Sequence, residues 1–409
     1  GDFNFSRGSA ATRINSQGLI ENVVSGQSRL DYPLIDGVVN GCPSLLLENS
    51  ATNLIQYSED FSNAYWNKTG ASVVSDAAIS PDGSLNAFKL VEDTSSGNHR
   101  FYSIISITSG LTYCQSIFAK AGSRNILQLA FGGKLDPTDY VNFNLTNGTV
   151  SHQVGNLNPQ IEYFNDGWYR CSVFTTAITT GTEAIYYQVQ ESPTASRFLT
   201  YQGDGTSGIY VWGAQLEQGS FPTSYIKSNS GSATTRSAET ANGAGDATTF
   251  NDSEGVLMAE ISALADDSSF KLFGINSGAT GNDIVILGYA NVSNTLYVNT
   301  KIGSTSVITS TAISIDQKSF NKILVKYKSG SNSIYVNGFK LDSNTNTFTP
   351  TGNQLSELEF SYYTNTLQFY GKTKQIQYFQ TALTDSELEQ LTSWTSFTDL
   401  ANGQQYSII

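Results

Sequence analysis

Several short segments in the first half of the sequence place an aromatic side chain next to planar polar ones. They are Tyr65-Trp66-Asn67, Asn98-His99-Arg100-Phe101-Tyr102, Arg124-Asn125 and Asp139-Tyr140. The flat C–H face of a sugar ring stacks on Trp or Tyr, and sugar hydroxyls hydrogen-bond to Asn, Asp and Arg. The pattern predicts a carbohydrate-binding site formed by Tyr65, Trp66, His99, Arg100, Tyr102, Arg124 and Tyr140. Core packing is the alternative for each aromatic, because large aromatic side chains are usually mostly buried.

Other residue types that could do chemistry give weaker patterns. Asp136 with Asp139, and Asp266 with Asp267, could supply oxygen ligands to Ca²⁺. Neither pair has the ligand spacing of a calcium loop. The two pairs are interpreted as solvated acidic loops, with structural calcium as the alternative. No other cofactor is assigned. The cysteines Cys42, Cys114 and Cys171 match no zinc or redox motif. Cys114 and Cys171 lie in strand-like sequence, where two buried thiols are favoured over a bridge between neighbouring strands.

The elements that must position these residues are strands. Runs rich in Val, Ile, Thr, Tyr and Phe recur about every ten residues between Gly, Asn, Asp and Ser, which is typical of a sandwich or barrel. Trp168 and Trp212 lie in such runs and are expected in a core. In the second half we expect strands at 255–261, 270–275, 283–289, 295–299, 321–327, 333–336 and 358–362, with a hairpin turn at Asn337-Gly338. The single expected helix spans 384–391, with Thr384 and Glu387 forming a capping box.

The domain organisation follows from composition. Between residues 227 and 249 the sequence holds small and polar residues with nothing evident to pack, which indicates a linker. We therefore expect an N-terminal docking or linking segment at 1–50, partly extended, and a first domain at 51–227. A linker at 228–249 and a second domain at 250–409 follow. The predicted fold class is all-β: two tandem antiparallel β-sandwich (jelly-roll) domains, a short N-terminal docking segment and one short C-terminal helix.

Segment order in the second domain carries a resemblance. Lys322-Ile323-Leu324-Val325-Lys326-Tyr327 precedes Ser333-Ile334-Tyr335-Val336-Asn337-Gly338, and the domain closes with Phe369-Tyr370-Gly371-Lys372, Gln375-Ile376-Gln377-Tyr378-Phe379 and Ala382-Leu383-Thr384-Asp385-Ser386-Glu387-Leu388. This order resembles laminin-G and concanavalin-type jelly rolls over about residues 250–400. The resemblance implies two curved antiparallel sheets.

The first domain carries a second resemblance. Its matching segments are Asn53-Leu54, Phe61-Ser62-Asn63-Ala64-Tyr65-Trp66, Pro81-Asp82-Gly83-Ser84, Ala87-Phe88-Lys89-Leu90, Gly167-Trp168-Tyr169-Arg170 and Tyr210-Val211-Trp212-Gly213-Ala214-Gln215-Leu216-Glu217. They are similar to jelly-roll carbohydrate-binding modules. With Asp2-Phe3-Asn4-Phe5-Ser6-Arg7, Gly18-Leu19-Ile20-Glu21 and Leu45-Leu46-Leu47-Glu48, the whole arrangement resembles structural proteins of tailed phages, in which such modules decorate tails, fibres or capsids. No catalytic motif comes with either resemblance.

The search for catalytic residues gives no complete set. Both histidines, His99 and His152, lie in the first domain, so the second lacks the Gln-x-His of concanavalin-like polysaccharide lyases. Concanavalin-like glycoside hydrolases carry Glu-x-Asp-x-x-Glu, which places paired carboxylates on one strand face. Glu357-Leu358-Glu359 and Glu387-Leu388-Glu389 do not complete that motif. We interpret Glu357 and Glu359 as solvent-facing strand residues, and we expect no enzyme activity.

The charge and composition of the chain limit the kinds of partner that it is expected to bind. The chain of 409 residues has 35 acidic and 22 basic residues, a net charge of -13, and no basic stripe that would neutralise nucleic-acid phosphates. No apolar run reaches the roughly 18 residues of a membrane helix, so membrane insertion is not expected. Only 14% of residues are charged while 12% are aromatic, a make-up typical of extracellular or virion β proteins.

Together these observations predict a non-enzymatic phage virion structural protein, a fibre, tail or capsid decoration, that binds host-surface glycans and other virion proteins. Its expected location is the virion, assembled in the cytoplasm of the bacterial host. We expect a homo-oligomer, with a trimer favoured, because such decorations usually form closed symmetric assemblies. A secreted polysaccharide-degrading enzyme, or its carbohydrate-binding region, is one alternative. A purely architectural virion protein that binds no glycan is the other.

Overall fold

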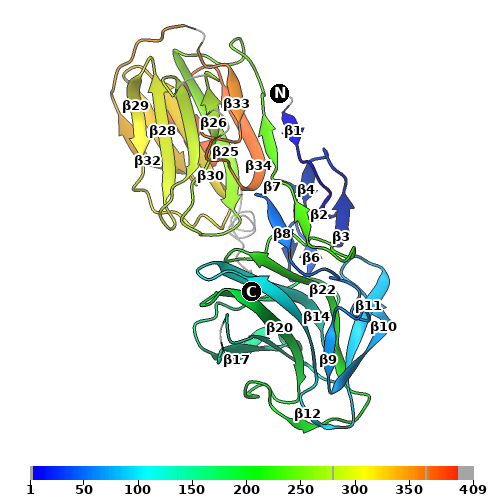
Figure 1. Ribbon diagram of the computed structural model, residues 1–409. Coiled ribbons are helices and arrows are strands. Elements are labelled where there is room, and N and C mark those ends of the chain that lie inside the picture. Colours follow the sequence, from blue (N-terminus) through cyan, green and yellow to red (C-terminus); the bar gives the residue numbers. More distant parts are fainter. Residues whose placement is uncertain (1–2, 136, 279–280, 353, 364–365, 395–409) are drawn as a thin grey trace.

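The computed structural model describes residues 3–135, 137–278, 281–352, 354–363 and 366–394. Within these residues the protein is almost entirely β, and its main strands form two antiparallel sandwiches, one above the other in Figure 1. Short strands of the N-terminal segment, drawn in blue, lie between and beside them (Figure 1). The predicted all-β sandwich fold is confirmed.

The first sandwich consists of two sheets with a shared apolar core. One, which we call the platform sheet, contains in order β17 (Thr149–Val154), β16 (Tyr140–Asn144), β15 (Ile126–Phe131), β20 (Gly181–Gln190), β13 (Arg100–Ile107) and β9 (Asn67–Thr69). The opposite sheet contains β10 (Ala71–Ile79), β11 (Leu85–Glu92), β22 (Gly208–Gln218), β14 (Thr112–Lys120), β19 (Trp168–Thr176) and β18 (Gln160–Tyr163). Successive strands such as β13, β14 and β15 change sheets, so the core is built from residues far apart in the chain.

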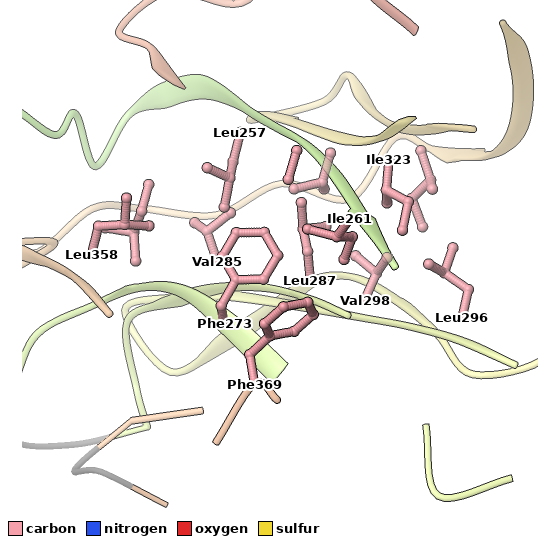
Figure 2. Close-up of a cluster of buried hydrophobic side chains, with 14 of the residues drawn as sticks. Leu257, Ile261, Phe273, Val285, Leu287, Leu296, Val298, Ile323, Leu358 and Phe369 are labelled. Atoms are coloured by element: carbon pink, nitrogen blue, oxygen red, sulfur yellow. The ribbon is translucent and has the colours of Figure 1, made fainter. Parts of the chain in front are cut away.

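The second sandwich has the same layered construction. One sheet contains β32 (Phe339–Asn344), β31 (Asn332–Val336), β30 (Asn321–Lys328), β25 (Glu254–Ala263), β34 (Gly371–Phe379), β7 (Ser44–Leu47) and β4 (Arg29–Asp31). The facing sheet contains β29 (Thr305–Ser310), β28 (Leu296–Ile302), β27 (Ile284–Tyr289), β26 (Lys271–Asn276) and β33 (Glu357–Glu359). Between them lies a cluster of buried side chains that includes Leu257, Phe273 and Leu287 (Figure 2).

Local sequence signals in the second half are confirmed. Strands form at every position expected there, although β33 is shorter than predicted. Asn337 and Gly338 both have positive φ, 50° and 88°, as the tight hairpin between β31 and β32 requires. Helix α1 (Asp385–Thr392) is the only helix in the described part of the chain, and Thr384 caps it in a capping box with Glu387. No helix of the described residues is long and apolar enough to cross a membrane.

The cysteines behave as small apolar residues. Cys114 and Cys171 are buried and free, whereas Cys42 is exposed. The register between β14 and β19 pairs Cys114 with Phe174 and Ile117 with Cys171, so the two thiols are not opposite one another. Burial raises the pKa of the Cys171 thiol well above its usual value. The bridge that the sequence left open does not form.

The N-terminal segment is an integral part of the second sandwich. Strand β7 pairs with β34, and β4 pairs with β7, so residues 29–47 extend the edge of a sheet whose other strands come from residues 254–379. The segment also contains two hairpins: β2 (Ala11–Ile14) with β3 (Ile20–Val23), and β5 (Leu34–Ile35) with β6 (Val38–Val39). The segment thus joins the second sandwich by strand addition, since an open sheet edge offers unpaired backbone groups.

The segment 228–249 differs from the expected linker. Its strand β23 (Thr234–Arg236) pairs with β8 (Ala51–Asn53), and β24 (Thr240–Asn242) pairs with β1 (Asn4–Ser6). Arg236 and Glu239 are fully buried. The expectation that these residues have nothing to pack against is wrong, because the charged partners of Arg236 and Glu239 come from distant parts of the chain.

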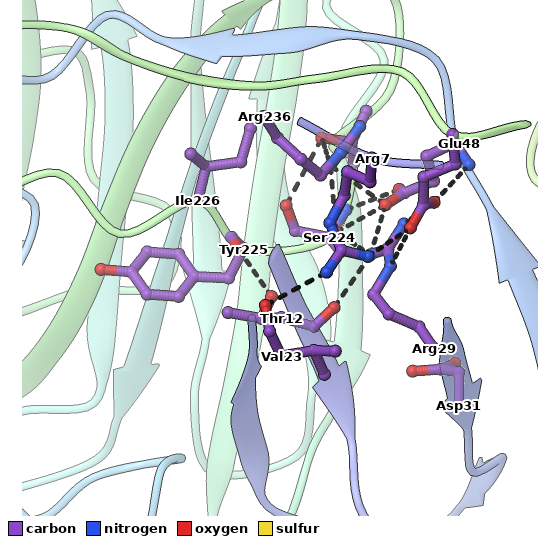
Figure 3. A network of polar contacts seen from close by, with 12 residues as sticks. Arg7, Thr12, Val23, Arg29, Asp31, Glu48, Ser224, Tyr225, Ile226 and Arg236 are labelled. Carbon is purple, nitrogen blue, oxygen red and sulfur yellow. Dashed lines mark hydrogen bonds and ion pairs between the residues drawn. The ribbon is translucent and has the colours of Figure 1, made fainter. Parts of the chain in front are cut away.

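Those partners form a buried charge network where the N-terminal segment meets both sandwiches (Figure 3). Glu48 Oε2 lies 2.8 Å from Arg29 Nη1 and 3.0 Å from Arg236 Nη1. Glu239 pairs with Arg29 and, at 2.7 Å, with Arg7. Ser224, which follows the last strand of the first sandwich, donates its backbone N–H to Glu48 Oε1 at 2.8 Å.

Removing a member of this network should destabilise the protein strongly. In Glu239→Ala, Arg7 loses its carboxylate partner and Arg29 loses one of its two, and breaking a buried pair costs about 3–5 kcal/mol. The matched control is Glu21→Ala, which breaks the partly exposed pair with Arg13 and should cost less than about 1 kcal/mol. Thermal unfolding monitored by calorimetry should show a large drop in Tm for the first variant only. Equal drops would contradict a central role for the network.

The network also predicts an acid-sensitive fold. Burial raises the pKa of the Glu48 carboxyl, but Arg236 and Arg29 outweigh this and hold its pKa at about 2. The pKa of Glu48 is lower in the folded state than in the unfolded state, where it is about 4.3. The carboxylate therefore contributes its full stabilisation above about pH 4.3, and this stabilisation is lost as the pH falls towards 2. We expect the Tm to fall steeply across that window. In Glu48→Gln the Tm should be lower than that of the parent at neutral pH, and it should fall less steeply as the pH is lowered through that acid window. If the Tm of the variant and of the parent fell with the same slope in the window, this assignment would be refuted.

Candidate functional site

The outer face of the platform sheet gathers aromatic and polar side chains. Along β13, Phe101, Ile105 and Ile107 point into the core, while Arg100 and Tyr102 point to the opposite face and stay half-buried. Successive side chains of a strand alternate between faces, so this division follows directly from the sequence of β13. The outer face is therefore available to present Arg100 and Tyr102.

The register of neighbouring strands extends this surface. Tyr102 is directly opposite Tyr186 of β20 and Asn67 of β9, and Arg100 is opposite Gln188 and Thr69. The rings of Tyr102 and Tyr186 have centroids 5.2 Å apart and planes tilted by 43°. Asn67 and Thr69 are exposed beside them. We call Asn67, Thr69, Arg100, Tyr102, Tyr186 and Phe198 the platform residues.

Arg100 lies among aromatic rings. Its guanidinium carbon is 4.6 Å from the ring centre of Tyr186, 4.4 Å from that of Phe198 and 5.9 Å from that of Tyr102. Such contacts are favourable because the face of an aromatic ring attracts a cation. Burial among the rings lowers the pKa of Arg100, with the tyrosines acting in the opposite direction. Phe198 has a φ of 54°, an uncommon left-handed conformation for a bulky residue.

Segment 191–200 covers the other half of the outer face. Asn142 Nδ2 donates to the carbonyl of Ala195 at 2.7 Å, and Gln128 Nε2 donates to that of Ser196 at 3.1 Å. The backbone N–H of Phe198 donates to Gln128 Oε1 at 2.9 Å. Side-chain amides of β15 and β16 thus hold the segment in place and bring Phe198 onto Arg100.

Two further amides are buried at this boundary. Gln188 and Gln190 of β20 are 0% exposed, and neither the amide nitrogen nor the amide oxygen of either has a hydrogen-bond partner among the described residues. Buried polar groups normally find a partner, since leaving one unpaired costs about 1–3 kcal/mol. These side chains therefore mark a place where a ligand or water would complete the hydrogen bonding.

The structure brings together part of the predicted site. Arg100, Tyr102 and Tyr140 share the outer face, because Tyr140 is opposite Ala130, which is opposite Tyr186. Tyr140 is only 5% exposed and lies beside the ring of His152, with centroids 5.7 Å apart. It supports the platform from the covered side.

Tyr65 and Trp66 lie in or against the core of the first sandwich. Trp66 is 2% exposed, packs edge-on against Phe101 and Tyr187, and donates its Nε1–H to the carbonyl of Tyr57. Tyr65 is partly buried against the same cluster. Both residues therefore have the core-packing role that the sequence left open as the alternative. Trp66 offers no open ring face to a sugar.

His99 and Arg124 belong to a separate polar cluster. His99 is fully buried, its ring nitrogens contact the carbonyl oxygens of Gly70 and Tyr201, and its ring lies 4.4 Å from that of Tyr201. Arg124 pairs with Glu92 at 2.8 Å, and Tyr201 donates its hydroxyl proton to the same carboxylate at 2.8 Å. Because each group has a protein partner, this cluster holds loops together at one end of the sandwich.

The acidic loop residues are also used within the protein. Asp139 Oδ2 accepts from the backbone N–H of Asn156, Asp266 accepts from Ser293 and Gln317, and Asp267 pairs with Lys271. Asp136 lies outside the described residues. Among the residues that the structure describes, no three His, Cys, Asp or Glu side chains are grouped so that they could hold a metal ion.

The carboxylate pair on β33 is not solvent-facing as expected. Glu359 is buried and accepts from Asn276 Nδ2 at 2.7 Å, while Glu357 is partly buried. The expectation is wrong for Glu359 because β33 is covered: Ala244 bridges to Leu358 across its free edge.

A cleft of about 910 Å³ lies between the sandwiches and is a second candidate location. Residues of the N-terminal segment, of β18 and β19, and of residues 262–266 line it. Several of its charges are paired within the protein, such as Lys372 with Asp31 at 2.9 Å and Arg13 with Glu21 at 3.0 Å. These charges of the cleft are therefore neutralised within the protein.

Comparison with protein-family models and with curated protein sequences finds no match for this chain. The description of the site therefore depends on its geometry alone.

Tyr186, Gln188 and Phe198 were missed by the sequence analysis. A usable signal existed for the first two: along β20, Tyr186, Gln188 and Gln190 alternate with the core residues Ile185, Tyr187 and Val189. Nothing local indicates that Phe198 folds back onto Arg100, because that contact depends on the path of segment 191–200.

The different environments of Trp66 and Tyr102 predict losses of stability of different size when each side chain is truncated. Trp66→Ala leaves a cavity beside Phe61, Phe101 and Tyr187 and should lower the free energy of unfolding by about 3–5 kcal/mol. Tyr102→Ala removes a half-buried surface ring and should cost about 1 kcal/mol or less. Chemical denaturation of both variants gives the comparison. Similar losses would show that Tyr102 is also a core residue.

Proposed function

We propose that the protein is a non-enzymatic glycan-binding protein and that the platform residues form its binding surface. The observation that carries the proposal is the placement of Tyr102, Tyr186 and Arg100 side by side on the outer face of the platform sheet. A sugar requires an apolar ring surface surrounded by planar hydrogen-bonding groups, and this face supplies both.

The contact geometry suits an extended chain of sugars better than a single small molecule. The tyrosine rings are neighbours on adjacent strands, and Asn67 and Thr69 of β9 continue the row to the exposed edge of the sheet. Stacking removes C–H and ring surface from water, while the amide of Asn67 and the hydroxyl of Thr69 can exchange hydrogen bonds with sugar hydroxyls.

The biological setting is a further part of the proposal. We propose that the chain is a virion structural protein of a tailed phage, assembled as a homo-oligomer together with other virion proteins, and that the platform binds a glycan on the host surface. Support for this setting comes from the sequence resemblance described above and from the polar, weakly charged composition.

Truncation of the platform tyrosines tests the proposal. In a glycan array and then by calorimetric titration with the strongest hit, Tyr186→Ala and Tyr102→Ala should each weaken binding by about tenfold, which corresponds to about 1.4 kcal/mol. Tyr163→Ala is the matched control, because Tyr163 is 40% exposed on β18 of the opposite sheet.

Two results would count against the platform. A loss of binding in Tyr163→Ala with none in the platform variants would move the site to the cleft between the sandwiches, which Tyr163 lines. The absence of any reproducible hit on arrays of bacterial, plant and algal polysaccharides would favour the purely architectural alternative.

A further inference from the structure

We infer that the platform recognises a carboxylated sugar, with Arg100 and Gln188 as the groups that bind the carboxylate. This inference rests on the proposed function, because it specifies which class of glycan the same surface binds. It is supported by the unpaired hydrogen-bonding groups on Arg100 and Gln188, and it does not depend on the tyrosine rings.

Arg100 is a cation without an anion. Within the described residues it makes no ion pair, and its Nε and Nη1 atoms are buried without a hydrogen-bond partner. The three arginines that are fully buried among the described residues contact carboxylates: Arg29 and Arg236 contact Glu48, and Arg7 contacts Glu239. Aromatic rings attract the charge of Arg100 but accept its N–H groups poorly, so a carboxylate would complete its interactions.

Gln188 is an independent indication of a ligand at the same point. It is 0% exposed, both polar atoms of its amide lack partners, and the strand register places it directly opposite Arg100 on the same face of the sheet. An amide N–H can donate to a carboxylate oxygen, and the amide oxygen can accept from a neighbouring sugar hydroxyl. Gln190, two residues further along the same face, has the same unpaired amide.

Access to this pair of residues is controlled by Phe198. Its ring lies over Arg100 at 4.4 Å and against Tyr186, with ring centroids 4.8 Å apart. The positive φ of Phe198 is costly for a bulky residue, so the ring is held over Arg100 in a strained conformation. Rotation of this ring away from Arg100 would expose the unpaired N–H groups while Gln128 and Asn142 keep the rest of segment 191–200 in place.

The charge of the ligand can be tested with matched sugars. The probes are oligomers of glucuronate, galacturonate, mannuronate and guluronate, and sialylated oligosaccharides, each alongside its methyl ester, together with unsubstituted neutral oligosaccharides. The methyl ester keeps the ring and its hydroxyls but removes the negative charge. We expect the wild-type protein to bind at least one free acid about ten- to a hundredfold more tightly than its ester, the range that a charge-assisted hydrogen bond supplies.

Variants then assign the preference to Arg100. Arg100→Gln should reduce the affinity for the acid to that for the ester, whereas Arg100→Lys should keep part of the preference because it keeps the charge. Arg13→Gln, which removes a partly exposed positive charge of the N-terminal segment, should leave the preference unchanged. Circular dichroism and Tm measurements on each variant show that differences in affinity do not come from unfolding.

The outcomes separate this inference from the proposed function. Equal affinity for acids and esters, with loss of both in Tyr186→Ala, would overturn the carboxylate assignment while supporting glycan binding. A preference for acids that survives in Arg100→Gln would overturn the role of Arg100. Tighter binding of sulfated oligosaccharides than of any carboxylated one would also overturn the assignment, and no binding by any probe would overturn both proposals.

Discussion

The strict alternation of side chains along β13 and β20 is the constraint on which the rest of the site depends. Antiparallel hydrogen bonding fixes the pairing of Tyr102 with Tyr186 and of Arg100 with Gln188. A shift of one residue would exchange the two faces and send Phe101 and Tyr187 to the surface. The large apolar core on the inner face makes such a shift very costly, so the same residues that stabilise the sandwich also position the platform.

A second constraint holds the sandwiches to the N-terminal segment. Three arginines and two glutamates are buried together, and they belong to segments separated by up to 232 residues. Buried ion pairs gain little net energy over apolar packing, but they penalise every arrangement in which one partner is missing. The network therefore favours one arrangement of these segments, while strand pairing of β4 and β7 supplies the cohesive contacts.

Features encoded by neighbouring residues were predictable from the sequence, and features created by distant contacts were not. The Asn337-Gly338 hairpin and the Thr384 cap follow from local chemistry and occur as expected. Arg100 and Tyr102 were named because aromatic and planar polar residues adjoin in that segment, and the strand places both on the outer face. Trp66 has similar neighbours in sequence, yet it fills a cavity among rings from other strands, which no local pattern reveals. The burial of Arg236 likewise depends on Glu48, far away in the chain.

The most direct test of the platform is to observe its rings while a ligand binds. Tyrosines labelled with ¹³C in the ring, assigned through Tyr→Phe variants, report each environment separately by NMR. On titration with the uronate oligomer that binds best, the signals of Tyr102 and Tyr186 should shift, while those of the core residues Tyr113 and Tyr187 should stay unchanged. Shifts at Tyr32 and Tyr163 with none at Tyr102 and Tyr186 would place binding in the cleft between the sandwiches and contradict this account.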